Sequence, residues 1–291
     1  QELKQVVRER RVVSTKLVES LSNSNETFED VGNIRSIIAT LFPGLASLSD
    51  KQSDTQKSEI DWQAVAVANA INKDFAIIAG GPGTGKTYTV TKLLAALIML
   101  ARVNVESQKE SQFTAPKISL VAPTGKAAQR LSESITSAVK AFRGTINDEV
   151  LDLIPEQAKT IHRLLGVIPE QVNFRHHQDN LLDIDILLID EVSMVDLPMM
   201  ARIFRALPIN TKVILLGDAD QLPSVAIGSV LADFAPRPHL GYSALNHQYL
   251  AQVTGYQSLT HDQTTDANSA QYSAADCVTF LMKSRRFDGE G

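Results

Sequence analysis

The sequence has little cysteine, since Cys277 is the only one among 291 residues. A single thiol cannot close an intrachain disulfide, and it excludes a zinc site built from several cysteines. The first residues, Gln1–Arg11, are charged and contain no apolar core of the kind that a secretory signal carries. The sequence does not begin with methionine, so we expect a fragment of a longer protein. These features predict a reducing, cytoplasmic setting.

The sequence also lacks long apolar runs and an excess of positive charge. Hydrophobic residues make up 44% and charged residues 21%, which is ordinary for a globular protein. We find no apolar run near the roughly 20 residues that a membrane span needs, and so expect no membrane association. The formal net charge of −5 weighs against a protein that coats DNA by bulk electrostatics, although it is compatible with a local groove.

Four short apolar runs follow one another along the chain, separated by stretches with helical character. Runs that are apolar throughout, rather than alternating, are typical of parallel strands covered on both faces. The sequence therefore predicts an α/β fold with a doubly wound parallel sheet, in which ligands bind at the carboxyl ends of the strands. The expected strands are Phe75–Ala79, Ile118–Ala122, Asp185–Ile189 and Lys212–Leu216.

The regions outside these runs suggest how the chain is divided. Residues 1–50 are expected to form a separate small helical segment, with helices through Gln1–Leu21 and around Ile34–Leu41. An α/β domain is expected over residues 51–277. Two polar stretches without periodicity are expected to be long surface loops. These stretches are Val105–Pro116 and Pro236–Ala275.

A phosphate-binding loop is predicted between the first strand and a helix that runs from Lys86 to Leu100. Residues Gly80–Thr87 fit the pattern G-x-x-x-x-G-K-[ST]. In such loops successive N–H groups and the positive end of the helix dipole face the phosphates. A glycine-rich turn without a ligand is the alternative, which the flanking strand and helix disfavour. The expected cofactor-binding residues are Gly81, Pro82, Gly83, Thr84, Gly85, Lys86 and Thr87.

The chemistry of that loop assigns roles to its last residues and to a pair of carboxylates. Lys86 should reach the β- and γ-phosphates of ATP, and Thr87 should place its hydroxyl on Mg²⁺. Asp190 and Glu191 end the third apolar run. We interpret Asp190 as the residue on the metal side and Glu191 as the general base that orients water. Acidic residues after a strand also cap the next helix, which is the alternative.

A further motif narrows the class of nucleotide-binding protein. The segment Gly217–Val225 resembles the G-D-x-x-Q-L-x-x-V motif of superfamily-one helicases. The resemblance implies that Gln221 senses the γ-phosphate and links it to the DNA-contacting surface. A hydrophilic turn capped by Asp218 is the alternative.

Two more segments resemble DNA-contacting motifs of the same family. They are Ala122–Ala128 and Thr160–Gly166. The resemblance implies DNA contacts from Thr124 and Lys126 in the first, and from Thr160 and His162 in the second. For the second segment, a helix start with Thr160 as its cap and His162 as an ordinary surface or packing residue is an equally good reading.

Two assignments concern the adenine of ATP and the side of the nucleotide site that a second motor domain would form. Gln63 precedes the first strand as the adenine-reading glutamine does in the family, and its amide has the donor and acceptor that adenine requires. Its neighbour Trp62 is as well explained as a core residue. Leu281–Phe287 resembles the motif that opens the second motor domain, which implies that Arg286 contacts the γ-phosphate. The family more often has tyrosine at the position of Arg285, so either arginine could act.

In their order and surroundings the motifs most resemble the alpha subunits of exodeoxyribonuclease V, the RecD family, over roughly residues 55–291. The family implies a RecA-like domain that uses ATP and Mg²⁺. It also implies 5′-to-3′ movement on single-stranded DNA, action at double-strand ends in repair and recombination, and beta and gamma subunits as partners. Residues 1–50 would end a partner-docking domain, and residues 278–291 would begin a truncated second motor domain.

Two rival functions stay open. One is a related superfamily-one helicase, either a stand-alone RecD-like enzyme or a relaxase-type motor. The other is an ATP-binding scaffold that moves nothing. We see no nuclease constellation of acidic residues and lysine outside the ATP site.

Overall fold

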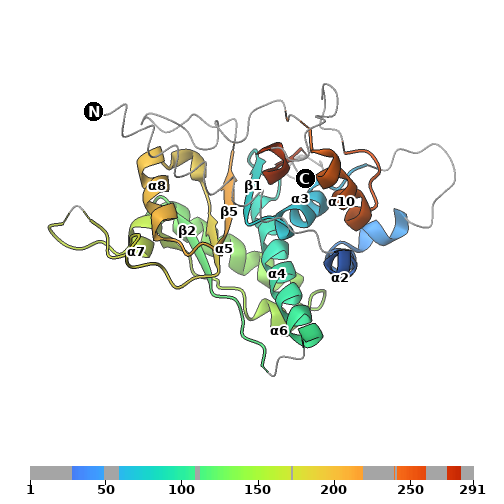
Figure 1. Ribbon diagram of the computed structural model, residues 1–291, viewed down its shortest axis with the longest axis horizontal. Coiled ribbons are helices and arrows are strands. Elements are labelled where there is room, and N and C mark those ends of the chain that lie inside the picture. Colours follow the sequence, from blue (N-terminus) through green and yellow to red (C-terminus); the bar gives the residue numbers. More distant parts are fainter. Residues whose placement is uncertain are drawn as a thin grey trace, which may run out of the picture.

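A computed structural model describes residues 28–48, 59–108, 112–171, 173–218, 239, 241–259 and 274–282. The described residues form a six-stranded sheet in the order β3-β2-β4-β5-β1-β6, and every neighbouring pair is parallel (Figure 1). The strands are β1 Phe75–Gly80, β2 Ile118–Ala122, β3 Lys159–Thr160, β4 Ile186–Ile189, β5 Lys212–Gly217 and β6 Val278–Leu281.

Helices connect the strands and cover both faces of the sheet (Figure 1). The α-helices are α2 Phe28–Leu41, α3 Trp62–Ile71, α4 Lys86–Gln108, α5 Gly125–Phe142, α6 Asp148–Leu151, α7 Ile161–Leu165, α8 Leu197–Ala206 and α10 Ala244–Thr254. The 3-10 helices are η1 Pro43–Leu48, η2 Val192–Met194 and η3 Ala274–Cys277.

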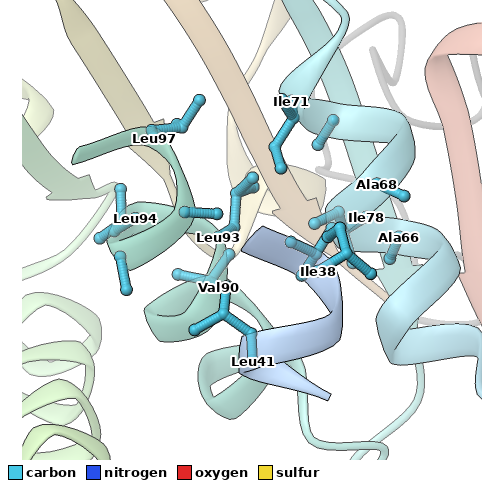
Figure 2. Close-up of a cluster of buried hydrophobic side chains, with 14 of the residues drawn as sticks. Ile38, Leu41, Ala66, Ala68, Ile71, Ile78, Val90, Leu93, Leu94 and Leu97 are labelled. Atoms are coloured by element: carbon cyan, nitrogen blue, oxygen red, sulfur yellow. The ribbon is translucent and has the colours of Figure 1, made fainter. Parts of the chain in front are cut away.

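Strands β1, β2, β4, β5 and β6 each supply side chains to two separate cores, one on each face of the sheet. In β1, Ala76 and Ile78 belong to the core under α2, α3, α4, α5 and α10, whereas Phe75 and Ile77 belong to the core under α7 and α8. Figure 2 shows Ile78 within the first core, among side chains of the covering helices. A strand buried on both faces must be apolar throughout, which explains the runs in the sequence. The predicted doubly wound α/β fold is confirmed.

One long polar stretch was interpreted wrongly. Within the expected loop 236–275 the chain forms α10, which begins at the capping side chain of Ser243 and ends at Gly255 with a φ of 83°. Its buried face includes Asn246, Tyr249, Leu250 and Val253. These positions follow the i, i+3, i+4, i+7 spacing of an amphipathic helix. The pattern was hidden because one of the four is an asparagine, held inside by a hydrogen bond to Asn69.

The other expected loop is also shorter than predicted. We expected it to begin at Val105, but α4 continues to Gln108. The part of α4 from Lys86 to Glu106 is the one described helix long and apolar enough to cross a membrane, contrary to the expectation from sequence. Half of its apolar window is buried inside the protein. That burial is typical of a core helix.

The expected domain limits do not match changes in packing. Helix α2 shares the first core, to which Ile34 belongs. Ile38 and Leu41 of α2 lie there beside α4 (Figure 2). At the other end, β6 pairs with β1 from Ile77 opposite Val278 onward, so residues 278–281 belong to this sheet. Residues 1–27 and 283–291 lie outside the described residues. The division into three parts as a whole stays a prediction.

Candidate nucleotide site and DNA-facing edge

The predicted motifs that the structure describes meet at one edge of the sheet. The phosphate loop follows β1, Asp218 follows β5, Asp190 follows β4, and Thr124 follows β2. Thr160 is the last residue of β3. Since all six strands are parallel, these positions share the carboxyl edge, where ligands bind in open α/β sheets.

The phosphate loop has a backbone that needs glycine. Gly83 and Gly85 have φ values of 81° and 84°, in the left-handed region that other residues rarely adopt. A Cβ atom on Gly85 would also lie 2.3 Å from Nε2 of Gln63. The hydroxyl of Thr84 donates to the carbonyl oxygen of Gly81 at 2.9 Å and so closes the loop.

Lys86 begins α4 and bends back over the loop. Its ammonium group donates to the carbonyl oxygens of Gly80 and Gly81, the latter at 3.2 Å. Thr87 follows in the first turn of the same helix. Both residues therefore stand where the helix N-terminus and the loop amides favour an anion.

Gln63 is held directly against the loop. Asp61 caps α3 by accepting from the backbone N–H groups of Gln63 and Ala64. The Gln63 side chain is buried, and its Nε2 donates to the carbonyl oxygen of Thr84 at 3.1 Å. Trp62 is half-buried and packs against the first core, in line with its interpretation as a core residue. The adenine contact of Gln63 stays a prediction.

Asp190 is a largely buried carboxylate beside the loop. Its Oδ1 accepts from the backbone N–H of Glu191 at 2.8 Å. Burial raises the pKa of Asp190 to about 6, and the charge of Glu191 adds to the rise, while that N–H and the charge of Lys86 oppose it. A divalent cation would favour the ionised form of such a group. The carboxylate therefore fits the metal-side role.

Glu191 adopts a strained backbone. Its φ of 53° and ψ of 42° are left-handed, a conformation that costs a non-glycine residue roughly 1–2 kcal/mol. It occupies the first capping position of η2, yet its side chain makes no capping hydrogen bond. The capping interpretation is therefore not supported for Glu191. Strain of this kind clusters at functional sites.

The predicted DNA contacts lie on two adjacent strands. In the register of β2 and β3, Ala122 stands opposite Thr160. Thr124 caps α5 by accepting from the N–H of Ala127 at 3.2 Å, and Thr160 caps α7 by accepting from the N–H of Arg163 at 3.2 Å. The capping interpretation of Thr160 is thus confirmed. A capping hydroxyl still has its proton to donate, so capping does not exclude a phosphate contact.

Two charged or aromatic positions complete this edge. The side chain of Lys126 is exposed. His162 is also exposed, and its ring packs edge-on against Phe174 with a centroid distance of 5.8 Å. The DNA contacts of both residues stay predictions.

Some predicted site residues cannot be placed. Gln221, Arg285 and Arg286 lie outside the described residues. Asp218 is described, and it is buried at the end of β5. Cys277 is a free, buried cysteine, and no cluster of three or more metal-ligating side chains occurs in the described ranges.

A group of arginines near His162 was not predicted from the sequence. Arg175 follows Phe174 in the loop after α7, and Arg202 and Arg205 lie on α8. The signal available was the run Asn173–His177, in which phenylalanine is followed by one arginine and two histidines. No motif pointed to Arg202 and Arg205 of α8, because they are distant from Arg175 in the sequence and lie near it only in the folded protein.

Comparison with known proteins agrees with this arrangement. The AAA domain family matches residues 63–227. The RecBCD enzyme subunit RecD of Haemophilus influenzae is 42% identical over 241 residues, covering 82% of this chain and 35% of that protein. The ATP-dependent RecD2 DNA helicase of Deinococcus radiodurans is 34% identical over 180 residues, covering 62% of this chain and 20% of that protein.

A crystal structure of the Pif1 helicase from Bacteroides aligns with 62% of this chain and 37% of its own, at 23% identity and a TM-score of 0.34. That likeness is too low to carry an argument. The chain spans about a third of the length of the RecD relatives it matches. The family match covers more than half of the chain, and the resemblance to RecD subunits is confirmed by several relatives. The chain therefore belongs to the AAA domain family, with RecD subunits among its relatives.

Proposed function

We propose that this chain supplies the nucleotide-binding domain of an ATP-dependent DNA helicase, a RecD-type motor subunit that moves 5′ to 3′. The observation that carries the proposal is the shared carboxyl edge, where the phosphate loop and Asp190 stand beside the capping hydroxyls of Thr124 and Thr160. Nucleotide and DNA would thus contact the ends of strands in one rigid sheet.

The residues on this edge have distinct tasks. Lys86 would leave the carbonyl groups of the loop for the β- and γ-phosphates, while Thr87 and Asp190 would hold Mg²⁺. When bound, Mg²⁺ neutralises charge on the phosphates. Glu191 would orient the attacking water and accept its proton. Gln221 and Arg286, outside the described residues, would sense and contact the γ-phosphate.

A short path joins the nucleotide side to the DNA side. The backbone N–H of Asp190 donates to the carbonyl oxygen of Val121 at 2.9 Å. Val121 lies in β2, the strand that leads to Thr124. We propose this hydrogen bond and the three residues of chain from Val121 to Thr124 as the route that couples Asp190 to the predicted DNA-contacting segment.

The substrates and partners of the proposal come from the named relatives. Relatives called RecBCD enzyme subunits support a complex with the beta and gamma subunits, acting on double-strand DNA ends in repair and recombination. Single-stranded DNA would be the track, and the compartment would be the cytoplasm. The RecD2 helicase relative keeps a stand-alone enzyme as the second candidate.

Unwinding and hydrolysis assays of the intact protein test the proposal. With partner subunits present, we expect ATP-dependent displacement of a strand from a duplex with a 5′ single-stranded tail, and not from one with a 3′ tail. Unwinding without the partners would favour the stand-alone enzyme. Nucleotide binding without DNA-stimulated hydrolysis would favour the scaffold and overturn the motor.

A further inference from the structure

Residues 167–171 and 173–181 form a loop that projects from the α7 and α8 side of the sheet (Figure 1). It is fixed at its base by backbone hydrogen bonds from Arg175 to Gly166 at 2.8 Å and from His176 to Leu165 at 2.9 Å. The amide of Asn180 also donates to the carbonyl oxygen of Arg175 at 2.8 Å. A Cβ on Gly166 would meet the Cβ of Arg175 at 2.9 Å, so the returning chain lies tightly against the end of α7.

Arginine and histidine side chains from this loop and from α8 line one cavity of about 620 Å³. Arg175, His176 and His177 come from the loop, and Arg202 and Arg205 come from α8. The carboxylate in the lining is that of Asp179, which lies 3.6 Å from His177. The cavity therefore gathers three guanidinium groups against one carboxylate that already has a neighbour.

The three guanidinium groups have no carboxylate partner among the described residues. In the part of the chain that the structure describes, none of the three forms an ion pair, whereas Arg102 pairs with Glu149 and Arg143 with Asp152. The whole chain carries a net charge of −5, so clustered positive charge is unusual in it. Uncompensated arginines in a concave site are suited to a polyanion, because the planar fork matches two phosphate oxygens.

The cavity is connected to the predicted DNA-contacting edge through Phe174. This side chain packs partly buried against the second core. On one side its ring contacts His162, two residues after the cap Thr160. On the other, the guanidinium of Arg202 lies over the same ring, 5.5 Å from its centroid. Phe174 thus contacts both His162 of α7 and Arg202 of α8.

We propose that the cavity lined by Arg175, Arg202 and Arg205 binds the phosphodiester backbone of a DNA strand, as a continuation of the contacts at Thr160. The inference rests on the proposed function, since it extends the track of the same strand. Nucleic acid is favoured over an acidic protein segment because the cavity adjoins the DNA-facing edge. Contacts of this kind position a strand and do not read its sequence.

Binding of a fluorescein-labelled oligothymidylate to the intact protein, followed by anisotropy over a range of salt concentrations, tests the inference. The variant is Arg202→Gln with Arg205→Gln, which removes two positive charges and keeps polar side chains. The matched control is Arg35→Gln with Lys140→Gln, exposed positions on α2 and α5 over the opposite face of the sheet. Melting by circular dichroism verifies that both variants fold.

The cavity variant should bind oligothymidylate roughly tenfold more weakly, with the slope of log affinity against log salt reduced by about 1.4, or 0.7 for each lost contact. The control should keep the wild-type slope. A wild-type slope in the cavity variant overturns the inference and leaves the proposed function standing. Polyglutamate serves as a second probe, which stands for an acidic protein segment. If the variant loses affinity for polyglutamate but not for oligothymidylate, the inference is overturned and the proposed function stands. Absence of salt-dependent binding by the wild type would overturn the proposed function itself.

Discussion

The two edges of the sheet are built in opposite ways. At the carboxyl edge, Glu191 is held in a left-handed conformation and Asp190 is a buried carboxylate with a pKa raised to about 6. At the amino edge, the half-buried Lys212 donates to the carbonyl oxygens of Ala70, Ile71 and Lys73, and so caps the end of α3. The carboxyl edge stores backbone strain beside a carboxylate, whereas at the amino edge the ammonium group of Lys212 is held by three carbonyl oxygens.

The difference indicates that contacts at the amino edge stabilise the fold, whereas side chains at the carboxyl edge serve the chemistry. Other contacts at the amino edge follow the rule, because the carboxylate of Asp185 accepts from the N–H of Lys117 at 2.7 Å and the hydroxyl of Thr211 donates to Ile184. Substitutions at the amino edge should therefore lower the free energy of unfolding. Substitutions at the carboxyl edge should abolish activity and leave the fold stable.

The largest effect is expected at Lys86. Lys86→Ala should abolish ATP hydrolysis by the intact protein, because no other described side chain donates an ammonium group inside the loop. The thermal midpoint should stay close to that of the wild type. Steady-state turnover and melting measure the two effects, with the exposed Lys140→Ala as control. Unchanged turnover in Lys86→Ala would contradict the site assignment.

Glu191→Gln should slow hydrolysis by roughly 10²–10⁴-fold while nucleotide binding persists. The amide has the same shape as the carboxylate, but it cannot take a proton from water. Equilibrium binding of a fluorescent ATP analogue and single-turnover hydrolysis separate the two steps. If binding fell as far as hydrolysis, Glu191 would be a metal-site or structural residue instead.

At the amino edge, Lys212→Met should lower the free energy of unfolding by about 2–3 kcal/mol, since buried carbonyl groups lose their donor. Urea unfolding measures the change, and Lys140→Met on the surface of α5 is the control. Nucleotide binding should be unchanged. If Lys212→Met weakened nucleotide binding and left the free energy of unfolding unchanged, the assignment of stability to the amino edge and activity to the carboxyl edge would be wrong.

The same variant gives a pH dependence. Burial lowers the pKa of Lys212 from 10.5 to about 8, so the folded protein releases this proton before the unfolded chain does. The wild type should therefore gain stability relative to Lys212→Met as pH rises from about 8 towards 10.5, by up to about 1.4 kcal/mol per pH unit. If the difference in free energy of unfolding between the wild type and Lys212→Met became smaller over this pH range, Lys212 would not have the lowered pKa in the folded protein.

The smallest effect concerns backbone strain. Asparagine tolerates the left-handed conformation better than glutamate, so Glu191→Asn should raise the free energy of unfolding by about 0.5 kcal/mol and abolish hydrolysis. Glu170 also has a positive φ, of 62°, and lies in the loop after α7. Glu170→Asn should give a similar gain and keep hydrolysis. Equal losses of activity in both variants would mean that strain at Glu191 has no special link to function.

Much of this edge was readable from the sequence, because parallel strands buried on both faces are apolar throughout and place their motifs at a common edge. That reasoning predicted β1, β2, β4 and β5, and it located the residues from Gly80 to Thr87. It missed β3 and β6, which are two and four residues long and depend on their neighbours for pairing. Such short strands carry no periodic signal of their own.

The remaining errors arose from polar residues that tertiary contacts bury. Asn246 and Tyr249 looked like loop residues, but their side chains bond to Asn69 and to the carbonyl oxygen of Ala68. The separation expected for residues 1–50 stays a prediction, although α2 packs on the first core. Lys92 of α4 donates to the carbonyl oxygen of Leu41, the last residue of that helix, and ties it to the domain.

The central claim, that nucleotide and DNA share the carboxyl edge, is tested most directly by adding charge at the two capping threonines. In Thr124→Asp with Thr160→Asp, aspartate still caps each helix, but it repels DNA phosphates. The control is Asn147→Asp, which adds a charge at the cap of α6, beside the far end of α4 where Arg102 pairs with Glu149.

The measurement is ATP hydrolysis by the intact protein with and without single-stranded DNA. The account predicts that the double variant loses stimulation by DNA while its hydrolysis without DNA stays at the wild-type level, and that Asn147→Asp is stimulated as the wild type is. Full stimulation of the double variant would show that DNA does not contact this edge and would contradict the account.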